Sequence, residues 1–234
     1  TATIGIWQDM LEDVRRRLAE EGRADLAEGL IVTATHTHSS GGRVFDHPIG
    51  EIAVAASDAN IVWAGTGEPF LRSNVSLGNG VWKSTDAGEN WTHMGLDATG
   101  RISRIIIHPD DPDVVYVAAV GHGYAPQQER GIYRTSDGGE TWQQVLFVDA
   151  ETGASDLVMN PSNPRILFAG MWQIALRTWM RKSGGPGSGI HMSRDGGTTW
   201  TRLEGNGLPT RDVGKIALCM SAADSDRIYA LIET

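Results

Sequence analysis

The stretch "STDAGENW", residues 84–91, decides the fold because nearly the same octapeptide returns twice, as "TSDGGETW" at 135–142 and "SRDGGTTW" at 193–200. All three fit the pattern Ser/Thr-x-Asp-x-Gly-x-x-Trp, and their aspartates lie 51 and 58 positions apart. A similarity that returns at this spacing indicates a repeat architecture. We call these octapeptides the three boxes. Their recurring positions are Ser84, Asp86, Gly88, Trp91, Thr135, Asp137, Gly139, Trp142, Ser193, Asp195, Gly197 and Trp200.

The same order of elements precedes each box. An apolar run such as "EIAVAA" leads into a Pro/Asp/Asn turn, a second apolar run such as "IVWAGTG", a Gly-rich loop and a short run entering the box. These runs have strand length and are rich in β-branched or aromatic residues, and an alternating stretch follows each box. Each unit therefore predicts four short antiparallel strands, which form one blade of a β-propeller. We predict an all-β partial propeller of about three and a half blades, over residues 49–96, 100–148, 154–205 and 212–233, preceded by a small helix-strand segment.

The boxes resemble the Asp-box, or bacterial neuraminidase repeat, which is shared by sialidases, xyloglucan-active glycosidases, sortilin-type receptors and photosystem assembly factors. Residues 49–234, with "GTGE", "GNGVWKSTDAGENWTHMGL" and "GNGLP", resemble bacterial sortilin-like propellers of the type labelled glycosyl-hydrolase-like. The resemblance implies the fold and a secreted or periplasmic bacterial protein. It does not choose an activity, because the same fold carries enzymes, receptors and assembly factors.

A structural role is predicted for the boxes. Each lies in the hairpin between the third and fourth strands, where the aspartate accepts backbone N–H groups, the glycine permits a left-handed turn and the tryptophan covers the hairpin. In a propeller these hairpins point outward and stay apart. A joint catalytic site built from Asp86, Asp137 and Asp195 is therefore not expected.

The loops between second and third strands lie on the opposite face and are irregular, which is where functional residues sit on a rigid scaffold. Loops between units add charged residues, among them Arg101 and Glu151. Aromatic rings beside charges suit a peptide, a glycan or a protein partner. Solvated loop residues and ion pairs between blades are the alternative. The predicted ligand-binding residues are Arg72, Asn74, His122, Tyr124, Arg130, Trp172, Arg177 and Trp179.

A glycoside hydrolase needs two carboxylates facing one bond, about 5–5.5 Å apart for retention or about 6.5–9.5 Å for inversion. Glu68 and Glu129 occupy comparable places in adjacent units, so they are the catalytic candidates. No sialidase-specific motif surrounds the arginines of these loops. We therefore predict a non-catalytic binding or scaffold propeller, with an Asp-box glycoside hydrolase as the alternative.

The first 48 residues differ in kind. "IWQDMLEDVRRRLAEEGRADL" predicts an amphipathic helix, and "GLIVTATHTHSSGG" predicts a buried strand that enters a Gly/Ser loop. The segment resembles the zinc-binding part of neutral, non-lysosomal ceramidases at residues 34–39, "ATHTHS", which makes His36 and His38 the candidate metal ligands. A catalytic zinc needs about three protein ligands, and no other histidine completes the pattern. We therefore expect no cofactor and an inactive ceramidase-like fragment, with zinc bound only if another domain completes the site.

The composition of the chain argues against two classes of partner, nucleic acid and membranes. The chain has 20 basic and 29 acidic residues, a net charge of −9 and no cluster of Lys and Arg, so neither nucleic acid nor an anionic membrane is expected. No apolar run reaches the roughly 18 residues of a membrane span, so no membrane insertion is predicted. The single cysteine, Cys219, is predicted to be a small core residue. An incomplete ring leaves open strand edges, which missing blades or another chain would cover.

Overall fold

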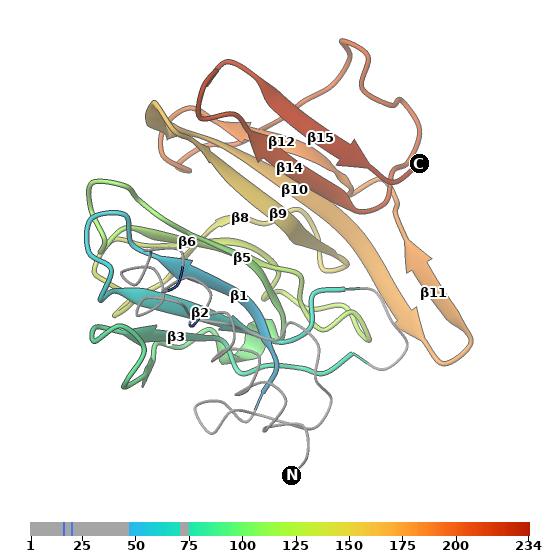
Figure 1. Ribbon diagram of the computed structural model, residues 1–234. Coiled ribbons are helices and arrows are strands. Elements are labelled where there is room, and N and C mark those ends of the chain that lie inside the picture. Colours follow the sequence, from blue (N-terminus) through green and yellow to red (C-terminus); the bar gives the residue numbers. More distant parts are fainter. Residues whose placement is uncertain (1–15, 17–19, 21–46, 71–74) are drawn as a thin grey trace. The chain divides into compact units, whose positions relative to one another are not determined.

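The computed structural model describes Arg16, Glu20, residues 47–70 and residues 75–234 (Figure 1). The chain divides into two units, Thr1–Asp46 and His47–Thr234. In the first unit only Arg16 and Glu20 are described; both are helical, and Arg16 Nη1 lies 2.8 Å from Glu20 Oε1. The predicted strand and the metal candidates His36 and His38 lie outside the described residues. In the described part of the chain, no helix is long and apolar enough to cross a membrane.

The described part of the second unit consists of antiparallel strands arranged in four sheets, together with one 3₁₀ turn, η1 (Asp97–Thr99). Sheet 1 contains, in spatial order, β1 (Ile49–Val54), β2 (Val62–Thr66), β3 (Val81–Ser84) and β4 (Thr92–His93). Sheet 2 contains β5 (Ile102–Ile107), β6 (Val115–Ala119), β7 (Gly131–Thr135) and β8 (Gln143–Leu146). Sheet 3 contains β9 (Thr152–Asn160), β10 (Asn163–Arg177), β11 (Met180–Ser183), β12 (Gly189–Ser193) and β13 (Thr201–Arg202). Sheet 4 is the pair β14 (Ile216–Met220) and β15 (Ile228–Ile232).

The prediction of a nearly all-β chain of four-stranded antiparallel sheets is confirmed. The number of blades stays a prediction. Sheet 3 differs from the expected unit, because β10 continues to Arg177 and forms a hairpin with β11 inside the stretch predicted as a long loop. The reason is the run Met171–Leu176, which is apolar except for one glutamine and buried throughout, as in a strand covered on both faces.

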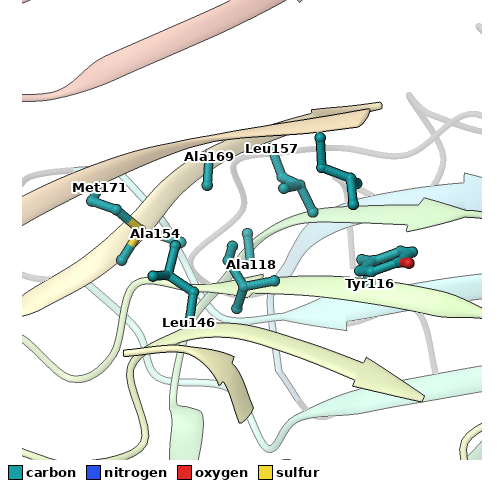
Figure 2. Packing of buried hydrophobic residues seen from close by; sticks show 9 residues of the cluster. Tyr116, Ala118, Leu146, Ala154, Leu157, Ala169 and Met171 are labelled. Atoms are coloured by element: carbon teal, nitrogen blue, oxygen red, sulfur yellow. The ribbon is translucent and has the colours of Figure 1, made fainter. Parts of the chain in front are cut away.

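The sheets pack face to face, and alternate residues of each strand point to opposite neighbours. Figure 2 shows Tyr116, Ala118 and Leu146 of sheet 2 facing Leu157 and Met171 of sheet 3 in one buried cluster. An equivalent cluster joins sheets 1 and 2, and a third joins sheets 3 and 4. The core is therefore divided into layers between sheets, as expected for a propeller.

A bulge recurs in the first strand of sheets 1, 2 and 3, where the register skips Gly50, Ser103 and Ser155. Ser103 Oγ donates to the carbonyl of Ala154 at 2.7 Å, and Ser155 Oγ donates to the carbonyl of Ile216 at 2.7 Å. The bulges of sheets 2 and 3 therefore aim a hydroxyl at the first strand of the next sheet, whereas the bulge of sheet 1 has a glycine at this position.

A charge network links all four first strands. Arg104 Nε lies 2.8 Å from Asp156 Oδ1, and Arg104 Nη1 lies 3.1 Å from Glu51 Oε1. The second oxygen of Asp156 accepts the backbone N–H of Leu218 at 2.8 Å. Burial raises the pKa of Glu51, against the opposing effect of Arg104. The side chains of Glu51, Arg104 and Asp156 thus stabilise the packing of one sheet on the next.

The prediction for Cys219 is wrong, because this residue is exposed. It lies on β14 opposite Tyr229 of β15, on the face that also carries the exposed Leu231. The alternate residues of β14, Ile216 and Leu218, point to the other face and pack against sheet 3. Alternation along the strand therefore places the thiol on the open face of sheet 4.

Candidate functional site

The aspartate of each box is enclosed by its own turn. Asp137 Oδ1 accepts the hydroxyl of Thr135 at 2.6 Å and the backbone N–H of Thr141 at 2.9 Å, while its Oδ2 accepts the hydroxyl of Thr141 at 2.5 Å. Thr135 Oγ1 in turn accepts the backbone N–H of Gly139 at 3.0 Å. The same bonds recur around Asp86 and Asp195, with Asn90 and Thr199 in place of Thr141.

These hydrogen bonds stabilise the ionised carboxylates. The pKa of Asp86 falls to about 2, chiefly through its bonds from Asn90. The pKa of Asp137 falls to about 2 through Thr135 and Thr141, and the pKa of Asp195 falls to about 2 through Thr199 and Ser193. A general acid needs a proton near neutral pH, so the three aspartates are unsuited to that role.

The second and third boxes also contact the preceding sheet. Gly138 O accepts Lys83 Nζ of β3 at 3.1 Å, and Gly196 O accepts the hydroxyl of Tyr116 of β6 at 2.9 Å. Trp142 Nε1 donates to Met94 O at 2.7 Å, and its ring meets Trp63 edge-on with centroids 5.9 Å apart. Trp91 and Trp200 instead donate to glycines of their own boxes. The second and third boxes therefore close their own turns and also tie their sheets to the sheets before them.

On the other side of the sheets, Arg101 is the most unusual residue. Its side chain is 0% exposed, and Nε donates to Gly121 O at 2.5 Å. Its Nη1 and Nη2 are buried and have no hydrogen-bond partner within the described residues. Burial, with a smaller contribution from the charge of Arg130, lowers the pKa of Arg101 to about 10. A guanidinium left in this state is costly, so its retention calls for an explanation.

Lys215, which precedes β14, lies between two aromatic rings near this arginine. Its Nζ is 4.4 Å from the ring centre of Phe70 and 5.4 Å from that of Trp172. Burial lowers the pKa of Lys215, Asp156 opposes that shift, and the charge of Arg101 adds to it. Phe70 comes from sheet 1 and is 57% exposed, whereas Trp172 of sheet 3 is buried. We call Phe70, Arg101, Trp172 and Lys215 the cation–aromatic cluster.

The cluster draws on every sheet, because its members come from the β2–β3 loop, the start of β5, β10 and the approach to β14. Two of its members, Phe70 and Lys215, were not singled out from the sequence. The sequence could have indicated Phe70, because it is an aromatic residue in a Gly- and Asn-rich loop. Nothing in the sequence indicated Lys215, since a single lysine before a strand is common.

The predicted arginines are engaged with backbone. Arg130 is buried, and its Nη1 and Nη2 donate to Glu151 O at 2.6 Å and Ala125 O at 3.1 Å. Burial lowers the pKa of Arg130 to about 10. Arg177 Nη1 donates to Tyr124 O at 2.8 Å, which joins the β10–β11 hairpin to the β6–β7 loop. These arginines therefore hold the loops in place.

The other predicted residues are scattered. Tyr124 is partly exposed, Trp179 lies at the tip of the β10–β11 hairpin, and the backbone N–H of His122 donates to Gln127 Oε1. Arg72 and Asn74 lie outside the described residues. In the described ranges, no group of three or more His, Cys, Asp or Glu side chains could hold a metal ion.

The two catalytic candidates differ in environment. Glu68 is buried, and its Oε2 accepts the backbone N–H of Ser76 at 2.7 Å. Glu129 is exposed, and its Oε2 lies 3.4 Å from Gln127 Nε2. Each of these contacts lies within the loop of its own glutamate. They do not bring the two carboxylates together around one substrate.

Comparison with known proteins identifies the class first. Residues 79–230 match the family model Sortilin-Vps10, described as sortilin, neurotensin receptor 3. The chain therefore belongs to this family, and its fold is a β-propeller of the sortilin type. None of the reported similarities supports the predicted likeness of residues 1–48 to ceramidase.

The particular relatives include a sorting protein and enzymes. The chain is 27% identical over 123 residues to a xyloglucanase from a Paenibacillus species, covering 49% of this chain and 10% of that one. It is 28% identical over 94 residues to the vacuolar protein sorting/targeting protein 10 of Sordaria macrospora, covering 39% of this chain and 6% of that one. The crystal structure of an ancestral GH74 enzyme matches with a TM-score of 0.57 at 16% identity, over 86% of this chain and 23% of that one. The chain thus spans a tenth or less of the length of these curated relatives.

Proposed function

We propose that this chain is part of a sortilin-like propeller that binds a peptide or protein ligand on its loop side, at the cation–aromatic cluster. The observation that carries the proposal is Arg101, whose Nη1 and Nη2 are buried without a hydrogen-bond partner in the described part of the chain. A stable protein rarely leaves a charge in this state unless it has a use. The family description as a receptor and the sorting protein from Sordaria macrospora support a binding role.

The cluster suits a ligand with an apolar and an acidic part. Phe70 offers a half-exposed ring to an apolar side chain, and Lys215 supplies an ammonium whose described contacts are to rings. Interfaces are enriched in aromatic residues and arginine, which supports a protein or peptide over a small ion. The neighbouring loops are bound to one another through Arg130 and Arg177, so the surface is preorganised.

Selection from a phage-displayed peptide library tests the proposal. Selected peptides should bind the wild-type chain and lose about tenfold or more in affinity with Phe70→Ala or Lys215→Gln, by isothermal titration calorimetry. Arg194→Gln, an exposed position within the third box, is the matched control and should leave affinity unchanged. Selected peptides that bind both cluster variants as tightly as the wild type would contradict the proposal.

A glycoside hydrolase is the second candidate, favoured by the sequence similarity to a xyloglucanase and by the buried carboxylate of Glu68. Release of reducing sugar from xyloglucan, lost with Glu68→Gln or Glu129→Gln but retained with Asp86→Asn, would favour this function over ligand binding. Absence of turnover together with peptide binding would leave the receptor-like role.

We further propose that sheets 1, 2 and 3 are one blade each, that the two strands of sheet 4 are half of a fourth blade, and that the boxes act as structural fasteners. The repeated bond set around Asp86, Asp137 and Asp195 supports this role, because every described bond to these carboxylates comes from within the same box. A secreted or periplasmic location and cover of the open sheet edges by further blades or another chain belong to the same proposal.

A further inference from the structure

The tip of the β10–β11 hairpin has an unusual composition. Arg177 pairs with Met180 across a two-residue turn, so Thr178 and Trp179 form the tip. Trp179 is 82% exposed and Met180 is 45% exposed. Figure 1 shows the hairpin extending beyond the other strands of its sheet. Residues 177–182 contain three cations and no carboxylate, on a chain whose net charge is −9.

The cations lie on both faces of the hairpin. Directly paired residues share a face, and successive pairs alternate between faces. Arg177 with Met180, and Lys182 with Ala175, therefore point to one side, whereas Arg181 shares the opposite side with Leu176. The described residues include no ion-pair partner for Arg181 or Lys182. Charge and apolar surface thus surround the tip.

We propose that this tip inserts into the headgroup layer of an anionic phospholipid membrane and anchors the propeller there peripherally. An indole is suited to the membrane interface, and arginine and lysine beside it reach phosphate and carboxylate headgroups. β10 and β11 pair with each other up to the turn, and the outer edge of β11 has no strand partner among the described residues, so the tip suits the hydrated headgroup layer and not the hydrocarbon core. A lipid layer encloses an inserted tip from all sides, whereas a folded protein partner contacts one face.

This inference departs from the sequence prediction that no anionic membrane binds, which used the net charge of the whole chain and the absence of a Lys/Arg cluster. Exposed charges interact across roughly 8 Å at physiological salt, so the cations near the tip decide which charged groups the tip attracts. The inference is independent of the proposed peptide site. The base of the hairpin nevertheless adjoins that site, since Trp172 Nε1 donates to Ser183 Oγ at 3.0 Å.

Flotation with lipid vesicles tests the inference on the full chain. Vesicles of phosphatidylcholine with about 30% phosphatidylserine should carry the wild-type protein, and vesicles of phosphatidylcholine alone should carry far less. Trp179→Ala should abolish most binding. Arg181→Gln with Lys182→Gln should weaken it about fivefold per cation removed, and higher salt should weaken it further.

Two control variants distinguish membrane binding by the tip from nonspecific adhesion of other exposed residues to the vesicles. Leu231→Ala removes another highly exposed apolar side chain, and Arg194→Gln removes another exposed cation, so both should bind as the wild type does. Thermal unfolding should confirm that the tip variants fold as the wild type does. Failure of the wild type to float would overturn the membrane inference and favour a folded partner for the tip. Flotation that the tip variants do not change would overturn it as well.

Discussion

The three boxes and the three loops between second and third strands follow the same repeat, yet their structures diverge. Each box repeats one set of hydrogen bonds, in which a Ser or Thr and an Asp bind backbone groups of their own turn. The loops differ in length and bond across sheets, as when Arg177 of β10 donates to Tyr124 O. The repeated boxes are therefore structural elements whose hydrogen bonds lie within one turn. The irregular loops instead form a surface that several sheets share.

The largest effect should come from a glycine pair that distinguishes two boxes. Gly88 and Gly139 both have a left-handed φ, of 93° and 100°. A Cβ at Gly139 would lie 2.5 Å from Trp63 Cη2, whereas at Gly88 the nearest atom is Trp91 Cζ2 at 3.5 Å. Gly88→Ala should cost about 1–2 kcal/mol for the backbone alone. Gly139→Ala should cost about 1–3 kcal/mol more through overpacking against sheet 1.

Urea unfolding at neutral pH measures both variants of this pair. Equal losses of stability would mean that the second box does not hold sheet 2 against sheet 1, and the role of the box would then be confined to its own hairpin.

Acid should weaken all three boxes together. The folded pKa of Asp86, Asp137 and Asp195 is about 2, below the ordinary value of 3.8. A depressed pKa contributes stability that is complete above the unfolded value and is lost as pH falls through the folded value. Thermal stability should therefore fall between about pH 4 and pH 2. The triple Asp→Asn variant should be less stable at pH 7 and flatter in this window; an unchanged slope would contradict the assignment.

The smallest effect concerns the turn residue after the box aspartate. Ala87 has φ 58°, and the equivalent positions in the other boxes are Gly138 and Gly196, each at φ 69°. A non-glycine residue is strained there, so Ala87→Gly should stabilise the chain by about 0.5–1 kcal/mol. Chemical denaturation checks this, and Ala98→Gly, in the 3₁₀ turn and without a left-handed φ, is the control that should not stabilise.

Much of the fold could be predicted because the repeat is local. The period-two runs, the turns and the box pattern lie within one unit, and four-stranded antiparallel sheets form as predicted, whereas the β10–β11 hairpin replaces a predicted loop. The contact between Trp142 and Met94 joins residues of different units, so the sequence pattern carries no sign of it. The sequence predicted Cys219 to be buried, but this residue is exposed because one face of β14 is open. An apolar run does not show which face of its strand is covered.

The sequence placed the candidate site on the irregular loop side, which stays a prediction, and Arg101 was noted there among the residues that link the units. The structure changes which side chains of this side are exposed. Arg130 and Trp172 were expected as displayed loop residues, whereas both are buried. Phe70 and Lys215 meet only because sheets 1 and 4 bring them together, and such a contact depends on the packing of the whole unit.

The central claim is that the boxes are structural and that the loop side, with Arg101, binds the ligand. The most direct test compares the peptide-induced shift in Tm of Arg101→Met with that of the wild type. A ligand at about 100 times its Kd stabilises the folded state by about 2.7 kcal/mol. Because Met removes a buried guanidinium with two unpartnered nitrogens, the account predicts an unliganded Tm at or above that of the wild type and no shift with a selected peptide. A lower unliganded Tm with the full peptide shift retained would show that Arg101 is structural and would contradict the account.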